Sequence, residues 1–384
     1  MTQLKQEFER KFPLQKYHFT IWPALIYPFR VDSESPFTSI MVSLGLSPMR
    51  GAVVSKKLTR RELAQQRQIF AGRRQQLEDF QRNLILDDQN RKLIWAVSGQ
   101  GGVGKSTMLR RYRELCHGHH YVTALVDEYT PNSVLGVMGA LAEQLEAAGH
   151  PLEGFTRRYR TYQQHQKQIE ADPERPTGFA QAIGKGSGRV LNEVVKTLPG
   201  VAIVPALLGE DFIVDKSGEL AAFVARKISN KDDVRLVLEP IKELTPLFIE
   251  NLSALAEHHA IALYFDTYER TATYLDDWLR EVLENKYGDL VPEVLVVIAG
   301  RDELGSAWLT ELIAPLLERI SLEPFTEDEA RDFLTQQDIV DQKAVDLLLR
   351  LSGRLPLLLT ALATNLPQNL DQLGDPTGTA LIVF

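Results

Sequence analysis

The chain has 384 residues, which is long enough for two domains with a substantial core. Hydrophobic residues make up 44% and charged residues 24%, as in an ordinary globular protein, and the net charge of −8 argues against wholesale nucleic-acid binding. One cysteine, Cys116, excludes an internal disulfide and favours the cytoplasm. The polar first residues do not resemble a secretory signal, and the apolar runs 21–29 and 201–208 are shorter than the roughly 20 residues of a membrane span.

Residues 1 to about 55 show no steady hydrophobic period and are not assigned to a domain. A basic stretch follows from Lys56 to Arg74, with seven Lys or Arg residues against one acid. We expect a helix over about 59–70, an interruption at Gly72, and a second helix over about 73–84 whose apolar residues share one face.

The most informative stretch begins with an apolar strand at 93–97 and continues into a glycine loop. Gly99, Gly104, Lys105 and Ser106 fill the pattern G-x-x-x-x-G-K-[ST]. Such a loop turns its backbone N–H groups around a polyphosphate, and the helix that follows adds the positive end of its dipole. Lys105 is expected to reach the β- and γ-phosphates and Ser106 to ligate Mg²⁺. The expected nucleotide contacts are Gly99, Gln100, Gly101, Gly102, Val103, Gly104, Lys105, Ser106 and Thr107.

Strands and helices alternate after this loop. Helical spacing continues through Leu115, a strand is expected at 121–126, and Thr130-Pro131 indicates the start of a helix that runs to about residue 148. This alternation predicts an α/β fold, a P-loop NTPase parallel sheet flanked by helices.

From about 151 to 233 the pattern loosens, and we interpret the segment as a partly helical insertion. Its glycine run 184–188 resembles a phosphate loop, but no strand precedes it, and a flexible turn is favoured. A long helix over about 234–258 then leads into a strand at 261–265.

Asp266 follows that strand directly and is the candidate for holding Mg²⁺ on the metal side of the phosphates. Glu269 is the nearest acid that could orient an attacking water, although many ATPases place this acid at the position of Thr267. The strand at 294–299 ends in Gly300-Arg301, and this arginine could contact the γ-phosphate.

A short strand is expected near 320–322, followed by a helical region over about 326–366. Thr326 and Glu329 fit a capping box, and Gly353 stands where a helix C-cap glycine belongs.

With these motifs, residues 69 to about 369 resemble the signal-transduction ATPases with numerous domains (STAND), the group that includes NB-ARC and NACHT modules. Phe70-Ala-Gly-Arg73 resembles the family's entry motif beside adenine, and Asp266-Thr-Tyr-Glu269 a bacterial form of its second nucleotide motif. Gly300-Arg301 matches its γ-phosphate-sensing arginine, and Ser352-Gly-Arg-Leu-Pro356 its "Gly-Leu-Pro" element, which lies near the base. The resemblance thus adds Gly72, Arg73 and Pro356 to the expected nucleotide contacts.

The resemblance implies a sheet domain over 91–325 after a helical lead-in over 56–90, and a small helical lid over 326–384. Such proteins normally continue into a winged helix and a repeat array, so a fragment or a reduced member is expected. The implied function is an ATP-binding, slowly hydrolysing switch with ATP, ADP and Mg²⁺ as ligands. MgATP would promote self-association or a larger signalling assembly, without membrane or favoured nucleic-acid contacts.

Three other functions were weighed against this one. An AAA+-type ATPase acting on DNA or a partner would use the basic stretch 56–74, and a non-hydrolysing scaffold would explain Thr267. A GTPase would use Asn230-Lys-Asp-Asp233 as an N-K-x-D motif. This run, however, precedes the expected metal-binding strand and is expected to end a polar helix. A metal site at Cys116-His-Gly-His-His120 is disfavoured, because its ligands crowd one short segment.

Overall fold

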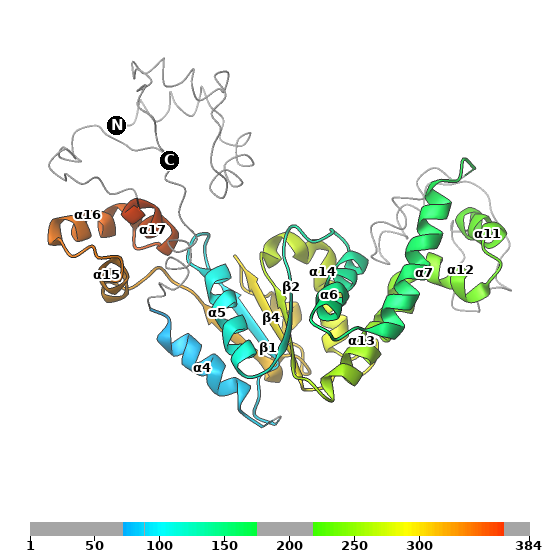
Figure 1. Ribbon diagram of the computed structural model, residues 1–384, viewed down its shortest axis with the longest axis horizontal. Helices are drawn as coiled ribbons and strands as arrows, with labels where there is room; N and C mark the ends of the chain where they lie inside the picture. The colour runs from blue at the N-terminus through cyan, green and yellow to red at the C-terminus, as the bar shows by residue number, and fades with distance from the viewer. Residues whose placement is uncertain (1–71, 88, 175–217, 365–384) are drawn as a thin grey trace, which may run out of the picture. The chain divides into compact units, whose positions relative to one another are not determined.

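Five short strands form one parallel sheet in the order β2-β3-β4-β1-β5 (Figure 1). The computed structural model describes residues 72–87, 89–174 and 218–364. The strands are β1 Ile94–Ser98, β2 Val122–Val126, β3 Ile261–Phe265, β4 Val294–Gly300 and β5 Leu317–Ser321. This confirms the predicted α/β class with a helix-flanked parallel sheet. The expected helix at 59–70 and the glycine run 184–188 lie outside the described residues, as does the unassigned region 1–55.

Alternate side chains along the strands enter two separate cores. On β1, Trp95 and Val97 join a cluster with α4 (Arg74–Leu84) and α5 (Lys105–Gly118). Ile94 and Ala96 join the opposite cluster with α6 (Val134–Ala147), α13 (Pro240–Ala256) and α14 (Tyr268–Leu283). The sheet is therefore covered on both faces, which explains why its inner strands are buried throughout (Figure 1).

Aromatic side chains fasten α4 to the α5 face of the sheet. Phe80 of α4 stacks on Tyr112 of α5 with ring centroids 3.9 Å apart, and Trp95 of β1 meets Phe80 edge-on at 4.9 Å. Both Phe80 and Tyr112 are fully buried. This packing anchors the lead-in helix directly beside the helix that follows the glycine loop.

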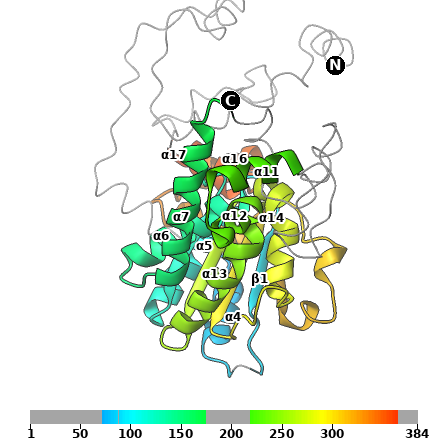
Figure 2. The same ribbon diagram turned by 90° about the vertical axis from the view of Figure 1, so that its right-hand side faces the viewer.

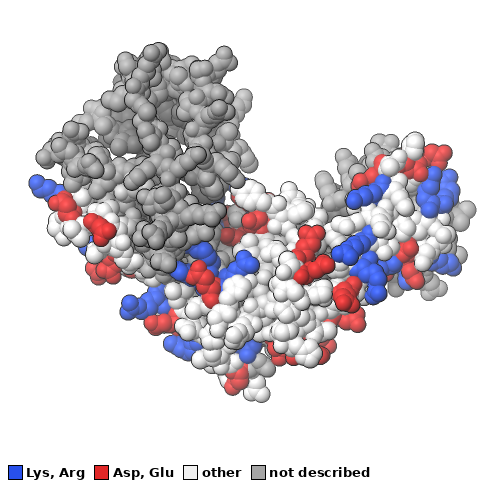
Figure 3. Space-filling model, in the orientation of Figure 1, with Lys and Arg blue, Asp and Glu red and all other residues white. Residues whose placement is uncertain are grey.

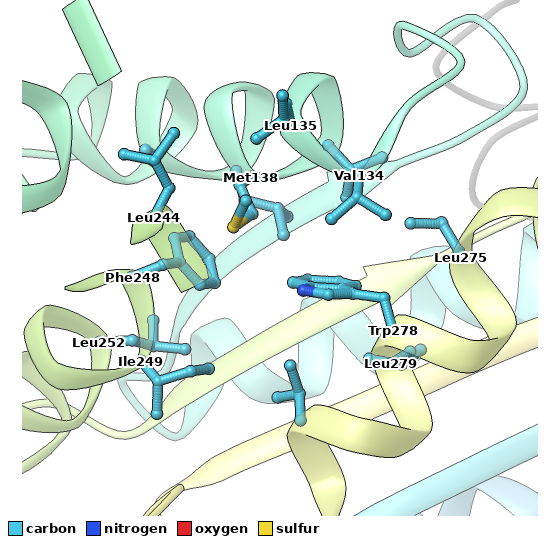
Figure 4. Close-up of a cluster of buried hydrophobic side chains, with 14 of the residues drawn as sticks. Val134, Leu135, Met138, Leu244, Phe248, Ile249, Leu252, Leu275, Trp278 and Leu279 are labelled. Atoms are coloured by element: carbon cyan, nitrogen blue, oxygen red, sulfur yellow. The ribbon is translucent and has the colours of Figure 1, made fainter. Parts of the chain in front are cut away.

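The opposite core has Trp278 at its centre (Figure 4). Its indole N–H donates to the Thr245 hydroxyl at 3.1 Å, and that hydroxyl lies 3.9 Å from the Met138 sulfur. These residues come from α14, α13 and α6. One buried threonine thus satisfies the indole where three helices meet, as a buried polar group requires.

Part of the expected insertion belongs to this second core. α7 (Glu153–Glu170) packs against α13 and against α12 (Lys231–Leu238), and α12 in turn contacts α11 (Gly218–Lys227) (Figure 2). Phe155 of α7 meets Phe248 of α13 edge-on with centroids 5.2 Å apart. The described parts of 151–233 are therefore largely helical, as predicted for a partly helical segment.

Four predicted boundaries were wrong in detail. The single helix over 234–258 is two helices, because Glu239 leaves the helical conformation and Pro240 begins α13. α6 begins after Ser133, whose hydroxyl accepts the Gly136 N–H, and not at Thr130-Pro131. Asn230 begins α12 as its N-cap instead of ending a helix, and β5 starts three residues before the expected 320.

Two short 3-10 turns, Ser306–Trp308 and Ala314–Leu316, precede β5. Within the described residues after β5, up to Thr364, the helices are α15 Glu327–Thr335, α16 Gln342–Ser352 and α17 Pro356–Thr364. The capping box of Thr326 and Glu329 and the C-cap at Gly353 are confirmed. Among the described helices, none is both long and apolar enough to cross a membrane.

Cys116 provides a test of the core around α5. The thiol is buried and accepts a hydrogen bond from the Tyr264 hydroxyl at 3.1 Å. Burial raises the pKa of Cys116 to about 12, so the reactive thiolate is scarce near neutral pH. We expect iodoacetamide to leave the native protein unmodified and to label it fully in urea, as measured by intact mass. Rapid labelling of the native protein would contradict the burial of this helix face.

Candidate functional site

The glycine loop lies at the carboxyl edge of the sheet, between β1 and α5. Gly102 and Gly104 adopt positive φ angles of 82° and 102°, which other residues reach only with strain. α5 begins at Lys105, directly after the loop, so its first N–H groups point into it. The predicted strand, glycine loop and helix are all present in this order.

Lys105 folds over this loop. Its Nζ donates to the carbonyl oxygens of Gly99 at 2.6 Å and Gln100 at 3.1 Å. Burial lowers the pKa of Lys105, while the nearby Glu269 opposes that shift and Arg301 adds to it. The ammonium group is thus held within the loop and is surrounded by the other charged candidate residues.

The two expected magnesium ligands lie near each other. The Asp266 carboxylate accepts the Thr267 N–H at 2.8 Å, and the Ser106 side chain is close enough to lower its pKa. Burial raises the pKa of Asp266 and neighbouring Asp127 raises it further, whereas Ser106 and the Thr267 N–H lower it. A hydroxyl and a carboxylate near each other beside the glycine loop are the oxygen ligands that a small cation such as Mg²⁺ takes.

Asp127 is a candidate residue that the sequence reasoning missed. It follows β2 directly, and β2 pairs with β3, so Asp127 lies at the same sheet edge as Asp266. The Asp266 N–H donates to the Val126 carbonyl at 2.9 Å, which fixes this neighbourhood. The sequence pattern could have indicated Asp127, because it follows an apolar strand just as Asp266 does.

Glu269 and Arg301 are brought together as an ion pair. The Arg301 Nε lies 3.1 Å from one Glu269 carboxylate oxygen, and the Arg301 backbone N–H donates to the other at 3.1 Å. Glu269 lies in the first turn of α14, where an acid complements the helix dipole. The two residues assigned separate roles from the sequence therefore engage each other in this structure.

α17 contacts the loop directly through its first turn. The Leu357 N–H donates to the Gly102 carbonyl at 3.1 Å. A Cβ placed on Gly102 would lie 3.1 Å from the Leu357 Cβ, so the two backbones approach closely. Pro356, predicted to lie near the nucleotide base, is the first residue of this helix and is therefore adjacent to the phosphate loop.

Gly72 and Arg73 contact the start of the helical region after the sheet. The Arg73 N–H donates to a Glu329 carboxylate oxygen at 3.1 Å, and its guanidinium bonds the Glu323 carbonyl and lies 5.5 Å from the centroid of the Phe325 ring. A Cβ on Gly72 would lie 2.4 Å from the same Glu329 oxygen. Glu329 thus caps α15 and also anchors the entry segment, a second role that its sequence pattern does not indicate.

Two other sequence motifs are engaged elsewhere. The Asp233 carboxylate pairs with Arg158 at 2.5 Å and with His165 at 3.3 Å, within the packing of α7 against α12. Cys116 lies within α5 itself, and no group of three or more metal-ligating side chains occurs among residues 72–87, 89–174 and 218–364. On the face shown in Figure 3, acidic and basic side chains lie beside one another.

Comparisons with known proteins give distant structural matches only. No family model and no curated protein matches the sequence. Cdc6p from Pyrobaculum aerophilum is similar at 15% identity with a TM-score of 0.35, over 75% of this chain and 51% of that one. The Orc1 protein of Aeropyrum pernix, solved in complex with DNA, is similar at 14% identity with a TM-score of 0.37, over 77% and 59%.

The chain thus spans between half and three-fifths of the length of these two proteins.

The contact between Gly102 and Leu357 can be tested with two matched alanine variants. Gly102→Ala and Gly104→Ala each introduce a side chain at positive φ, at a cost of about 1–2 kcal/mol. Only Gly102→Ala also meets Leu357, since nothing lies within 4 Å of a Cβ on Gly104. We expect Gly102→Ala to lower the free energy of unfolding by about 1–3 kcal/mol more than Gly104→Ala, measured by urea denaturation.

In a Leu357→Gly background this difference should shrink, because all the Leu357 side-chain atoms that a Cβ on Gly102 would meet are removed. Equal destabilisation by the two glycine variants in the parent protein would contradict the close approach of α17 to the loop.

Proposed function

We propose that the protein is an ATP-binding, slowly hydrolysing molecular switch of the STAND type. The observation that carries this proposal is the proximity of Ser106, in the first turn of α5, to Asp266, directly after β3. A hydroxyl and a carboxylate beside a glycine loop would suit a metal ion and the polyphosphate that it accompanies. The sheet domain over 91–325, the lid over 326–384 and the lead-in over 56–90 remain proposals within the same scheme.

The side chains around the loop have separate tasks in this scheme. Lys105 exchanges its carbonyl contacts for phosphate oxygens, a stronger charge-assisted interaction. Ser106 and Asp266 hold Mg²⁺, which neutralises charge on the phosphates. Arg301 contacts the γ-phosphate, and Glu269 orients the attacking water. We expect turnover to be slow, because Glu269 is not in the position after Asp266 that many ATPases use.

The helical region would report the bound nucleotide. α17 touches the loop at Gly102, and Arg73 ties the entry segment to the start of α15. A nucleotide that changes the loop therefore changes the contact that holds α17. Such a switch needs a ligand that binds two arrangements with different affinity, and the γ-phosphate supplies that difference between ATP and ADP.

Nucleotide binding is the first test. We expect Lys105→Ala and Asp266→Asn to lower MgATP affinity about tenfold or more, measured by isothermal titration calorimetry, because each removes a charge that faces the phosphates or their metal. Lys92→Ala is the matched control, since Lys92 precedes β1 and binds the Pro315 carbonyl at 2.6 Å. Unchanged MgATP affinity in both site variants would remove the proposed site. Competition by GTP for the same site would favour the GTPase alternative.

Self-association is the second test. We expect MgATP to raise the molar mass measured by light scattering and MgADP to leave it unchanged, because only ATP brings the γ-phosphate to Arg301. Lys105→Ala should not respond to either nucleotide. A mass that is the same with ATP, ADP and no nucleotide would contradict the switch and favour a nucleotide-bound scaffold. Salt-dependent binding to mixed-sequence DNA would favour the AAA+ alternative.

A further inference from the structure

Arg301 is clamped at the end of β4 by two neighbouring elements. Its carbonyl accepts the Gly99 N–H of the phosphate loop at 3.2 Å, and its backbone N–H donates to the Glu269 carboxylate at 3.1 Å. Its side-chain Nε pairs with the second Glu269 oxygen, also at 3.1 Å. The residue therefore connects the loop to the first turn of α14.

The two members of the ion pair differ in exposure. The Glu269 side chain is 17% exposed and that of Arg301 is 50% exposed. An incoming anion can therefore reach the guanidinium, whereas the carboxylate is largely covered. Both carboxylate oxygens of Glu269 contact Arg301, so its water-orienting role requires that this pairing first change.

We propose that Glu269 is a positioning residue that competes with the γ-phosphate for Arg301 and so limits the preference for ATP over ADP. The inference rests on the proposed function, since it assumes that a nucleotide occupies the loop. A γ-phosphate is an anion that a guanidinium binds as it binds a carboxylate. In the proposed exchange a triphosphate takes the Arg301 guanidinium from Glu269, whereas a diphosphate leaves the pair intact. Only ATP binding carries the cost of that exchange.

The displaced carboxylate has room to move. Glu269 borders a cavity of about 310 Å³ between β1, β4, β5 and the start of α14. Ser98, Ser321 and Arg319 contribute polar groups to its wall, and the acids Asp276, Asp302 and Glu303 also line it, so the displaced carboxylate is expected to turn toward Arg319. If Arg301 moves from Glu269 to the γ-phosphate, the Glu269 carboxylate becomes free to orient the attacking water. Hydrolysis would then follow binding of the γ-phosphate by Arg301.

A purely structural role for Glu269 predicts a different result. As an acid in the first turn of α14, it stabilises the helix through the dipole. Loss of that stabilisation would affect the two nucleotides equally. The ratio of ATP affinity to ADP affinity separates the competition from the structural role.

The experiment measures this ratio by calorimetry in wild type and in Glu269→Gln, with Mg²⁺ present throughout. We expect the ratio to rise about threefold to fivefold in the variant, the effect of one partly exposed ion pair. Asp302→Asn is the matched control, because Asp302 also acts electrostatically on Lys105 and is the residue after Arg301. Its ratio should change less than that of Glu269→Gln.

A double-mutant cycle with Arg301→Gln distinguishes competition from simple repulsion between Glu269 and the phosphates. Under competition, Glu269→Gln no longer raises the ratio once Arg301 is replaced. An equal rise in both backgrounds, or no rise in the parent protein, would overturn the inference. Glu269→Asp provides a second route if the Gln variant does not fold, because it keeps the charge but shortens the reach to Nε. Failure of wild type to bind either nucleotide would instead refute the proposed function.

Discussion

The proximity of Ser106 to Asp266 is the constraint on which the candidate site depends. It brings the first turn of α5 to the end of β3, although β4 lies between β1 and β3 in the sheet. The register makes this reach possible, since Ser98 at the end of β1 pairs with Gly300 and Phe265 at the end of β3 pairs with Ile298. The carboxyl ends of β1 and β3 therefore lie within two residues of each other along β4, at the edge where open α/β sheets hold their ligands.

The same edge holds the contacts to the helices after the sheet. Leu357 reaches the phosphate loop through a backbone hydrogen bond, and Glu329 joins Arg73 to the cap of α15. Both contacts involve glycines that leave no space for a side chain, Gly102 and Gly72. The loop is thus joined to α17 by a backbone hydrogen bond, and the entry segment is joined to α15 through the Glu329 side chain.

Much of this arrangement could be predicted from local sequence patterns. Short apolar runs bounded by glycine or acidic residues gave four of the strands nearly at their observed positions, and the glycine loop gave the start of α5. The capping box at Thr326 and the C-cap at Gly353 were also predictable, because each depends on residues within one helical turn. The start of α6 was misplaced because Thr130-Pro131 and Ser133 carry similar capping chemistry, and tertiary packing selects between them.

Contacts that depend on register could not be predicted in this way. Glu269 and Arg301 are separated by 32 residues, and no local period relates them. Their pairing follows from the placement of α14 beside the end of β4, where a Cβ on Gly300 would lie 3.6 Å from the Glu269 N. Glu269, expected to orient water, and Arg301, expected to contact the γ-phosphate, are therefore paired with each other. If the proposed roles hold, binding of the γ-phosphate by Arg301 and release of the Glu269 carboxylate would be two consequences of one exchange, and neither would need a separate conformational signal.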